Sequence, residues 1–220
     1  MPKSASEPAV RPSLTRERIV LAAIELVERE GEDALSMRAV AAELGVAVMS
    51  LYNHVPNKAD LLSGVAQYVV AGMGLPDDSA DDWKTRARAL IWAFRRAAHD
   101  YPECINIVLT HSVDFPVGMR PAERALAIAD AAGFDGATSV RIMRAMLAYA
   151  LGAQMREIGA VKMLNDLPPD PSTLFAELDP AEFPHVTALA TELTEHDPET
   201  DFEFGLELLI SALDALPRRP

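Results

Sequence analysis

The chain has 220 residues, half of them hydrophobic, which allows a substantial buried core divided between one small and one larger domain. Its formal net charge is −13, from 33 acidic and 20 basic side chains, so sequence-independent attraction to nucleic acid is expected to be weak. The single cysteine, Cys104, excludes an intramolecular disulfide framework, and without a run of roughly 18 apolar residues we expect a cytoplasmic protein with no membrane partner.

The N-terminal region predicts a short arm followed by a helix. Residues 1–12 are rich in Pro, Ser and Ala, which is typical of a flexible arm. From Thr15 to Glu30 the apolar residues recur at helical spacing, which indicates one buried face. The residues of that face are Ile19, Ala22, Ala23, Leu26 and Val27.

Residues 36–58 predict two short helices joined by a tight turn. Ser36 is suited to cap the first helix, and Gly45 can adopt the left-handed conformation that ends it. The second helix is expected to start at Ala47, almost without a linker. A turn of about three or four residues at a steep helix crossing places the second helix in the DNA major groove. The segment therefore predicts a helix-turn-helix.

The side chains of this segment are of kinds that bind DNA. Hydroxyl, imidazole and ammonium groups can donate to phosphate oxygens, and apolar side chains can touch thymine methyl groups. Arg38 carries the one guanidinium of the segment, and a guanidinium binds two acceptors of a guanine or a phosphate at once. The predicted DNA-binding residues are Ser36, Arg38, Ala47, Val48, Met49, Ser50, Tyr52, Asn53, His54 and Lys58.

Further helices are expected along the rest of the chain. A fourth begins at Lys58 and ends at Gly74, and a fifth is stopped by Pro102. Shorter helices are predicted at residues 103–110 and 121–133. Because the fourth helix carries Lys58 at one end and apolar residues along its length, we expect it to act as a lever between two domains.

Two later helices, at residues 139–162 and 201–216, are apolar on more than one face. In the first, Val140 and Leu147 lie on one stripe while Ile142 lies on another. A helix in water shows this pattern when it is buried on two sides. Two such helices can cover each other's spare faces across a twofold axis, so the pattern predicts a four-helix homodimer interface.

The stretch from Asn165 to Pro184 contains five prolines with polar residues between them. This composition predicts a mobile connection, and its position between the two interface helices suggests a pocket lid. A further single helix is expected after it, around Val186, Leu189 and Leu193.

The acidic excess lies in the C-terminal part of the chain. Residues 1–75 carry 7 basic and 9 acidic side chains, whereas residues 76–220 carry 13 and 24. Non-specific affinity for DNA comes mainly from neutralising phosphates. Specific binding is therefore expected to depend on individually placed contacts.

Several motifs match one protein family closely: Ala34-Leu35-Ser36-Met37-Arg38, Leu44-Gly45-Val46, Leu51-Tyr52-Asn53-His54-Val55 and Asn57-Lys58-Ala59-Asp60-Leu61-Leu62. Through them residues 14–62 resemble the N-terminal domain of the tetracycline-repressor-like (TetR) family of transcriptional regulators. Residues 202–210, with Trp83, resemble the C-terminal domain of the branch that contains the tetracycline repressor itself. The resemblance implies an all-helical homodimer that binds a palindromic double-stranded DNA operator and leaves it when a small-molecule effector binds.

The same resemblance implies a helix-turn-helix DNA-binding domain at residues 13–60 and a helical ligand-binding and dimerisation domain at residues 61–220. The candidate pocket residues are mostly apolar, and methionine adapts a cavity to different shapes. We therefore expect a mostly apolar effector. The candidates are Leu90, Phe94, Val108, Leu109, His111, Met143 and Met146.

No metal and no cofactor is expected, because the five histidines show no metal-ligand spacing. The positions where the tetracycline repressor holds its drug and magnesium correspond here to Met73, Gly74, Val108 and Leu90. Such residues cannot ligate a hard divalent cation, so tetracycline with magnesium is disfavoured as the effector.

Two other classes of function compete with that of a ligand-responsive DNA-binding regulator. The chain shows no Gly-rich phosphate loop, G-x-S-x-G turn or metal motif, so we do not expect an enzyme. The alternative that stays open is a helix-turn-helix protein that acts mainly through a protein partner, without a small-molecule effector. The acidic C-terminal part permits this reading.

Overall fold

The computed structural model describes residues 13–77, 82–111, 115–165, 175–195 and 197–219, with the side chains of residues 115 and 158–165 left out of the description. The regular elements of these residues are all helices, as the sequence predicts. They form two compact units. The first unit takes residues 1–72 and 100–119, and the second takes residues 73–99 and 120–220.

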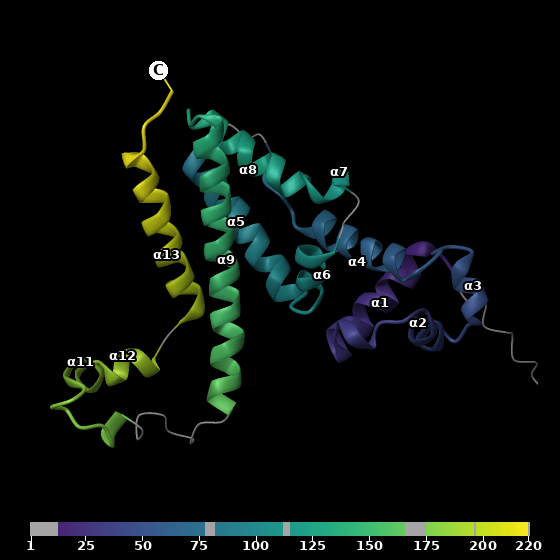
Figure 1. Ribbon diagram of the computed structural model, residues 1–220, viewed down its shortest axis with the longest axis horizontal. Helices are drawn as coiled ribbons and strands as arrows, with labels where there is room; N and C mark the ends of the chain where they lie inside the picture. The colour runs from purple at the N-terminus through teal and green to yellow at the C-terminus, as the bar shows by residue number, and fades with distance from the viewer. Residues whose placement is uncertain (1–12, 78–81, 112–114, 166–174, 196, 220) are drawn as a thin grey trace, which may run out of the picture. The chain divides into compact units, whose positions relative to one another are not determined.

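The first unit contains the helix-turn-helix and the helices packed against it (Figure 1). Its elements are α1 (Arg16–Glu30), the 3₁₀ turn η1 (Glu32–Ala34), α2 (Met37–Leu44), α3 (Val48–Tyr52), α4 (Lys58–Gly72), α6 (Cys104–Thr110) and α7 (Phe115–Gly118). The apolar stripe predicted for α1 is buried, and Ile19, Ala23 and Val27 are fully enclosed. Helices α2, α4 and α6 pack against α1 and exclude water from that stripe.

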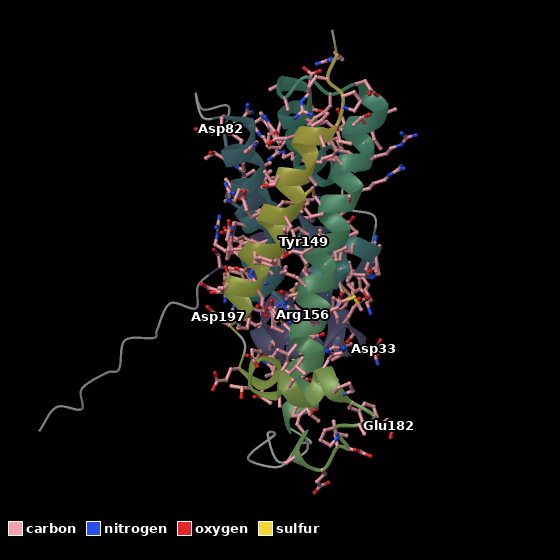
Figure 2. The ribbon with its side chains drawn as sticks, turned by 90° about the vertical axis from the view of Figure 1, so that its left-hand side faces the viewer. Asp33, Asp82, Tyr149, Arg156, Glu182 and Asp197 are labelled. Atoms are coloured by element: carbon pink, nitrogen blue, oxygen red, sulfur yellow. The ribbon has the colours of Figure 1, made fainter. Side chains whose placement is uncertain are left out.

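The second unit is built from longer helices. Its elements are α5 (Trp83–Asp100, belonging to this unit as far as His99), α8 (Arg120–Ala131), α9 (Gly136–Asn165), α11 (Pro184–Ala188), α12 (Ala190–Thr194), α13 (Pro198–Ala212) and the 3₁₀ turn η2 (Leu213–Ala215). Helices α9 and α13 lie side by side, and Figure 2 shows Tyr149 between them.

The three longest helices of the second unit begin with the same arrangement, an Asp with a Thr three residues later. Asp82, Asp135 and Asp197 each accept the hydroxyl of that Thr, at 2.8, 2.7 and 2.6 Å. Each carboxylate also accepts a backbone N–H of the first turn, which satisfies a donor that the helix leaves unpaired. Hydrogen bonds from the Thr hydroxyls hold the pKa of Asp82 and Asp135 below the usual value. The local sequence therefore fixes where these helices start.

The core of the second unit lies where α5, α9 and α13 meet. It is formed by Ile91, Met146, Ala150, Phe202, Leu206 and Ile210. The ring of Tyr149 stacks on Phe202 at 5.3 Å between centroids, and its hydroxyl donates to the Phe202 carbonyl oxygen at 2.6 Å. Gly205 makes this approach feasible, because a Cβ there would lie 2.4 Å from the Tyr149 oxygen. The contact holds α9 and α13 close together.

The second apolar faces of α9 and α13 are exposed in this chain. On α13, Phe204 is 66% exposed and Leu208 is 57% exposed. On α9, Leu147 and Met155 are also open to solvent. Residues Phe204 and Leu208 are four positions apart, so they lie on one face of their helix. The two-faced pattern in the sequence therefore corresponds to one face in the core and one on the surface.

The structure differs from the sequence predictions after residue 183. Instead of one helix it has two five-residue helices, α11 and α12, which meet at Leu189, whose backbone is not helical. Neither helix buries a residue, so packing does not hold one continuous helix together. Residues 166–174 of the predicted lid and residues 1–12 of the predicted arm lie outside the described residues.

Candidate nucleic-acid interface

The turn between α2 and α3 has the geometry that the sequence predicts. Ser36 Oγ accepts the N–H of Ala39 at 3.1 Å and starts α2. Gly45 has φ 64° and ψ 35°, the left-handed conformation, and ends that helix. The N–H of Val46 then bonds back to the Ala41 carbonyl oxygen at 3.0 Å. Only three residues, 45–47, separate α2 from α3, and this short turn fixes the angle between the two helices.

Helix α3 is held by its inner side and presents its outer side to solvent. Leu51 and Val55 are fully buried. Met49 is 73% exposed, and Tyr52 is also exposed. Met49 and Tyr52 therefore lie on the side of α3 that is open to another molecule.

The start of α4 provides a second group of donors. Asn57 Oδ1 accepts the N–H of Asp60 at 2.9 Å and caps the helix. Lys58 is the first residue of the helix, and its side chain is exposed. The N-terminus of a helix attracts anions through its free N–H groups and its dipole, and an ammonium group there adds to this attraction. This helix end is suited to a phosphate group.

The structure places all ten predicted DNA-binding residues in the first unit, in the segment from the start of α2 to the start of α4. Val48 and Ser50 are half-buried, and the other eight are exposed. The Ser36 hydroxyl oxygen accepts the backbone N–H of Ala39, and the hydroxyl hydrogen can still donate to a phosphate oxygen. Arg38 is exposed at the second residue of α2.

The seven predicted pocket residues are divided between the units. Leu90, Phe94, Met143 and Met146 belong to the second unit, where Met146 lies in the core and Phe94 packs against it. The other three, Val108, Leu109 and His111, belong to the first unit, on α6 or at its end. His111 Nε2 lies 2.7 Å from Glu32 Oε1.

Two groups of contacting residues in the structure were not predicted from the sequence. In the second unit, Arg95 is 8% exposed, pairs with Glu157 at 2.6 Å and lies 4.4 Å from the ring centre of Phe202. In the first unit, Glu28 accepts backbone N–H groups at the start of α6. Arg95 lies four residues after Ile91, on the buried face of α5. This spacing is a sequence signal from which a buried arginine could have been predicted.

Cys104 is fully buried, as expected of a packing residue. Burial, and after it the Glu28 carboxylate, raises the pKa of the Cys104 thiol. The thiolate is the reactive form of cysteine, so this thiol is unreactive at neutral pH.

Two family models match this chain, one in its N-terminal part and one in its C-terminal part. The family model of bacterial regulatory proteins of the tetR family matches residues 19–65, and that of the tetracyclin repressor-like C-terminal domain matches residues 75–216. The chain belongs to the TetR family. The helix-turn-helix described above is therefore that of a TetR-family regulator.

Individual members of the family resemble this TetR-family chain over different lengths. An HTH-type transcriptional regulator of Saccharopolyspora erythraea is 33% identical over 67% of this chain, which spans 62% of that protein. The tetracycline repressor protein class C of Escherichia coli is 28% identical over 92% of both chains. The crystal structure of the Streptomyces coelicolor TetR family protein ActR in complex with actinorhodin has a TM-score of 0.75 at 26% identity, over 92% of this chain and 98% of that chain.

Within the described residues of this TetR-family chain, no helix has the length and apolar character needed to pass through a membrane. In the same part of the chain, no three His, Cys, Asp or Glu side chains are grouped so as to hold a metal ion.

Proposed function

We propose that this TetR-family protein is a transcriptional repressor that binds a palindromic operator as a homodimer in the bacterial cytoplasm. The observation that carries the proposal is the exposed outer side of α3, where Met49 and Tyr52 project from a helix fixed by buried Leu51 and Val55. This is the side that a recognition helix places in the major groove. Arg38 and Lys58 supply positive charge on either side of it in the sequence.

The exposed faces of α9 and α13 support the dimer. Phe204 and Leu208 on α13 are large apolar side chains in water, and the same face of a second subunit would cover them. A twofold dimer also presents two copies of α3 to two half-sites of one operator. On this proposal residues 13–60 bind DNA, and residues 61–220 bind the effector and form the dimer.

We propose a small, mostly apolar effector that releases the operator. ActR, which resembles this chain along most of its length, has been crystallised with actinorhodin. The predicted pocket residues of the second unit, Leu90, Phe94, Met143 and Met146, are all apolar and supply no charged or hydrogen-bonding side chain. Met73 and Leu90 are buried apolar residues that offer no ligand for a hard cation, which argues against tetracycline with magnesium.

The experiment that tests the function is selection of binding sequences from random duplex DNA by the purified protein. Enrichment of a palindrome, bound by two protein chains in fluorescence anisotropy titrations, is the result that the proposal requires. The selected duplex then serves as the probe in a screen for molecules that release it. If the protein is folded and dimeric but enriches no sequence, the result would favour the alternative function, in which the protein acts through a protein partner.

Two substitutions separate phosphate contacts from base contacts. Lys58→Ala is expected to weaken binding to all sequences alike and to reduce the salt dependence by about one ion per subunit, because one phosphate contact is lost.

Arg38→Ala is expected to cost about 1–3 kcal/mol of binding free energy and to relax specificity at one base pair, since a base-edge contact is lost. Anisotropy at two salt concentrations measures both. Unchanged affinity in both variants would remove these residues from the interface.

A modified operator tests whether Met49 reads a thymine. Replacing individual thymines of the selected half-site by deoxyuridine removes only a methyl group. If Met49 packs on that methyl, we expect about fourfold weaker binding at one position, as the loss of one buried methyl predicts. Met49→Ala should bind the thymine and uracil duplexes equally at that position. Equal sensitivity of the two proteins to the replacement would show that another residue makes the contact.

A further inference from the structure

Helix α6 is attached at its start to the last turn of α1. Glu28 accepts the N–H of Cys104 at 2.9 Å on one carboxylate oxygen and the N–H of Glu103 at 3.3 Å on the other. These two N–H groups belong to the first residue of α6 and the residue before it, which have no partner within the helix. One carboxylate of α1 therefore fixes the N-terminus of α6.

The other end of α6 is attached to the same region. His111 is the residue that follows the last turn of α6, and its Nε2 lies 2.7 Å from Glu32 Oε1. Glu32 begins η1, four positions after Glu28. Between the two attachments, Cys104, Ile105 and Ile107 are buried in the first unit. Two carboxylates, four residues apart, thus hold a seven-residue helix at both ends.

The same turn of α1 is also attached to the helix-turn-helix. Arg29, next to Glu28, forms an ion pair with Glu43 in the last turn of α2. Helix α2 carries Arg38 at its start and packs against α3. A continuous series of polar contacts therefore runs from α6 through residues 28–32 to the helices proposed to bind DNA.

The contact between His111 and Glu32 suits a positioning role better than a stabilising one. His111 and Glu32 are 35% and 34% exposed, and a polar contact with that much access to water contributes at most about 1 kcal/mol to folding. An attachment that weak can form and open within the folded protein. The contact therefore acts mainly on how α6 is positioned relative to α1 and α2.

We propose that Glu28, Glu32 and His111 form a clamp that couples the position of α6 to that of the DNA-binding helices, so that operator binding and clamp closure favour each other. This inference rests on the proposed function and identifies positioning residues for it. Coupling between two events is reciprocal in free energy. Operator binding must therefore stabilise the clamp by the same factor by which the clamp strengthens operator binding.

Hydrogen–deuterium exchange on the purified protein, with and without the selected operator, tests the clamp. In the wild-type protein, the selected operator is expected to slow amide exchange over residues 103–111 at least about fivefold, the lower end of typical allosteric couplings. Glu28→Ala and His111→Ala should abolish most of that slowing, and thermal unfolding of His111→Ala should stay nearly unchanged, because its contact with Glu32 is exposed. His111→Gln keeps a side-chain donor for Glu32 and should restore it. Glu25→Gln, exposed on α1 and outside the clamp, is the matched control.

A second measurement needs no DNA. In the free protein, His111→Ala is expected to speed amide exchange in α2, residues 37–44, although His111 lies far away in the sequence. Operator binding without any slowing in residues 103–111, or unchanged exchange in α2 of the free His111→Ala variant, would overturn the clamp. Failure of the wild-type protein to bind any operator would instead contradict the proposed function, and the measurement on the free protein would still decide whether α6 and α2 are coupled.

Discussion

Exchanging Phe204 and Leu208 together for glutamate is expected to make the protein monomeric at micromolar concentration and to abolish its binding to the operator. Both side chains are large, apolar and mostly exposed on one face of α13. If a second subunit covers them, the dimer loses the burial of four side chains at about 1.5–3 kcal/mol each. That loss corresponds to a dimer dissociation constant raised at least about 10⁴-fold, before the repulsion between four new carboxylates is added.

The design of this experiment separates dimer loss from unfolding. Because both side chains already face water in one chain, the variant is expected to keep its helical circular dichroism. Met119→Glu makes the same change at an exposed apolar residue of the first unit and should leave the dimer intact. Analytical ultracentrifugation gives the mass, and anisotropy gives operator binding. A double variant that still sediments as a dimer would exclude this face from the interface.

The helix-turn-helix was predictable because short-range chemistry determines it. Ser36 and Gly45 fix the two ends of α2 through contacts within a few residues, and Asn57 does the same for the start of α4. Leu51 and Val55 are buried at a spacing that the sequence pattern indicates. Which of the exposed side chains touch DNA is still a prediction, since exposure alone does not distinguish a contact from a solvated surface.

The attachment of α6 to the first unit was not predictable from local pattern. It depends on hydrogen bonds between residues about 75 positions apart, such as that of Glu28 with Cys104. Glu28 and Glu32 have the spacing of ordinary surface carboxylates on a helix, so nothing near them in the sequence distinguishes them. The break between α11 and α12 at Leu189 is similar, because it follows from the lack of a packed face, which a pattern of apolar residues does not reveal.

Replacing Glu157 by leucine is expected to lower the free energy of unfolding by about 3–5 kcal/mol, because it leaves the buried Arg95 charge without its carboxylate. The two side chains are 8% and 16% exposed and lie 2.6 Å apart. The Arg95 guanidinium would keep its contacts with the Phe202 and Trp92 rings and a long hydrogen bond of 3.4 Å to the Pro198 carbonyl oxygen, none of which supplies a negative charge. Urea denaturation at one fixed protein concentration measures the loss.

Two controls connect this loss to the unpaired charge. The double variant Arg95→Met with Glu157→Leu removes both charges and is expected to recover most of the stability, since well-packed apolar side chains replace a buried ion pair at little cost. Asp201→Asn breaks the exposed pair with Arg156, whose atoms lie 3.6 Å apart, and should cost less than about 1 kcal/mol. A change within about 1 kcal/mol for Glu157→Leu itself would mean that the Phe202 ring and the Pro198 carbonyl suffice for Arg95. In that case this arginine holds α5 against α13 without needing α9.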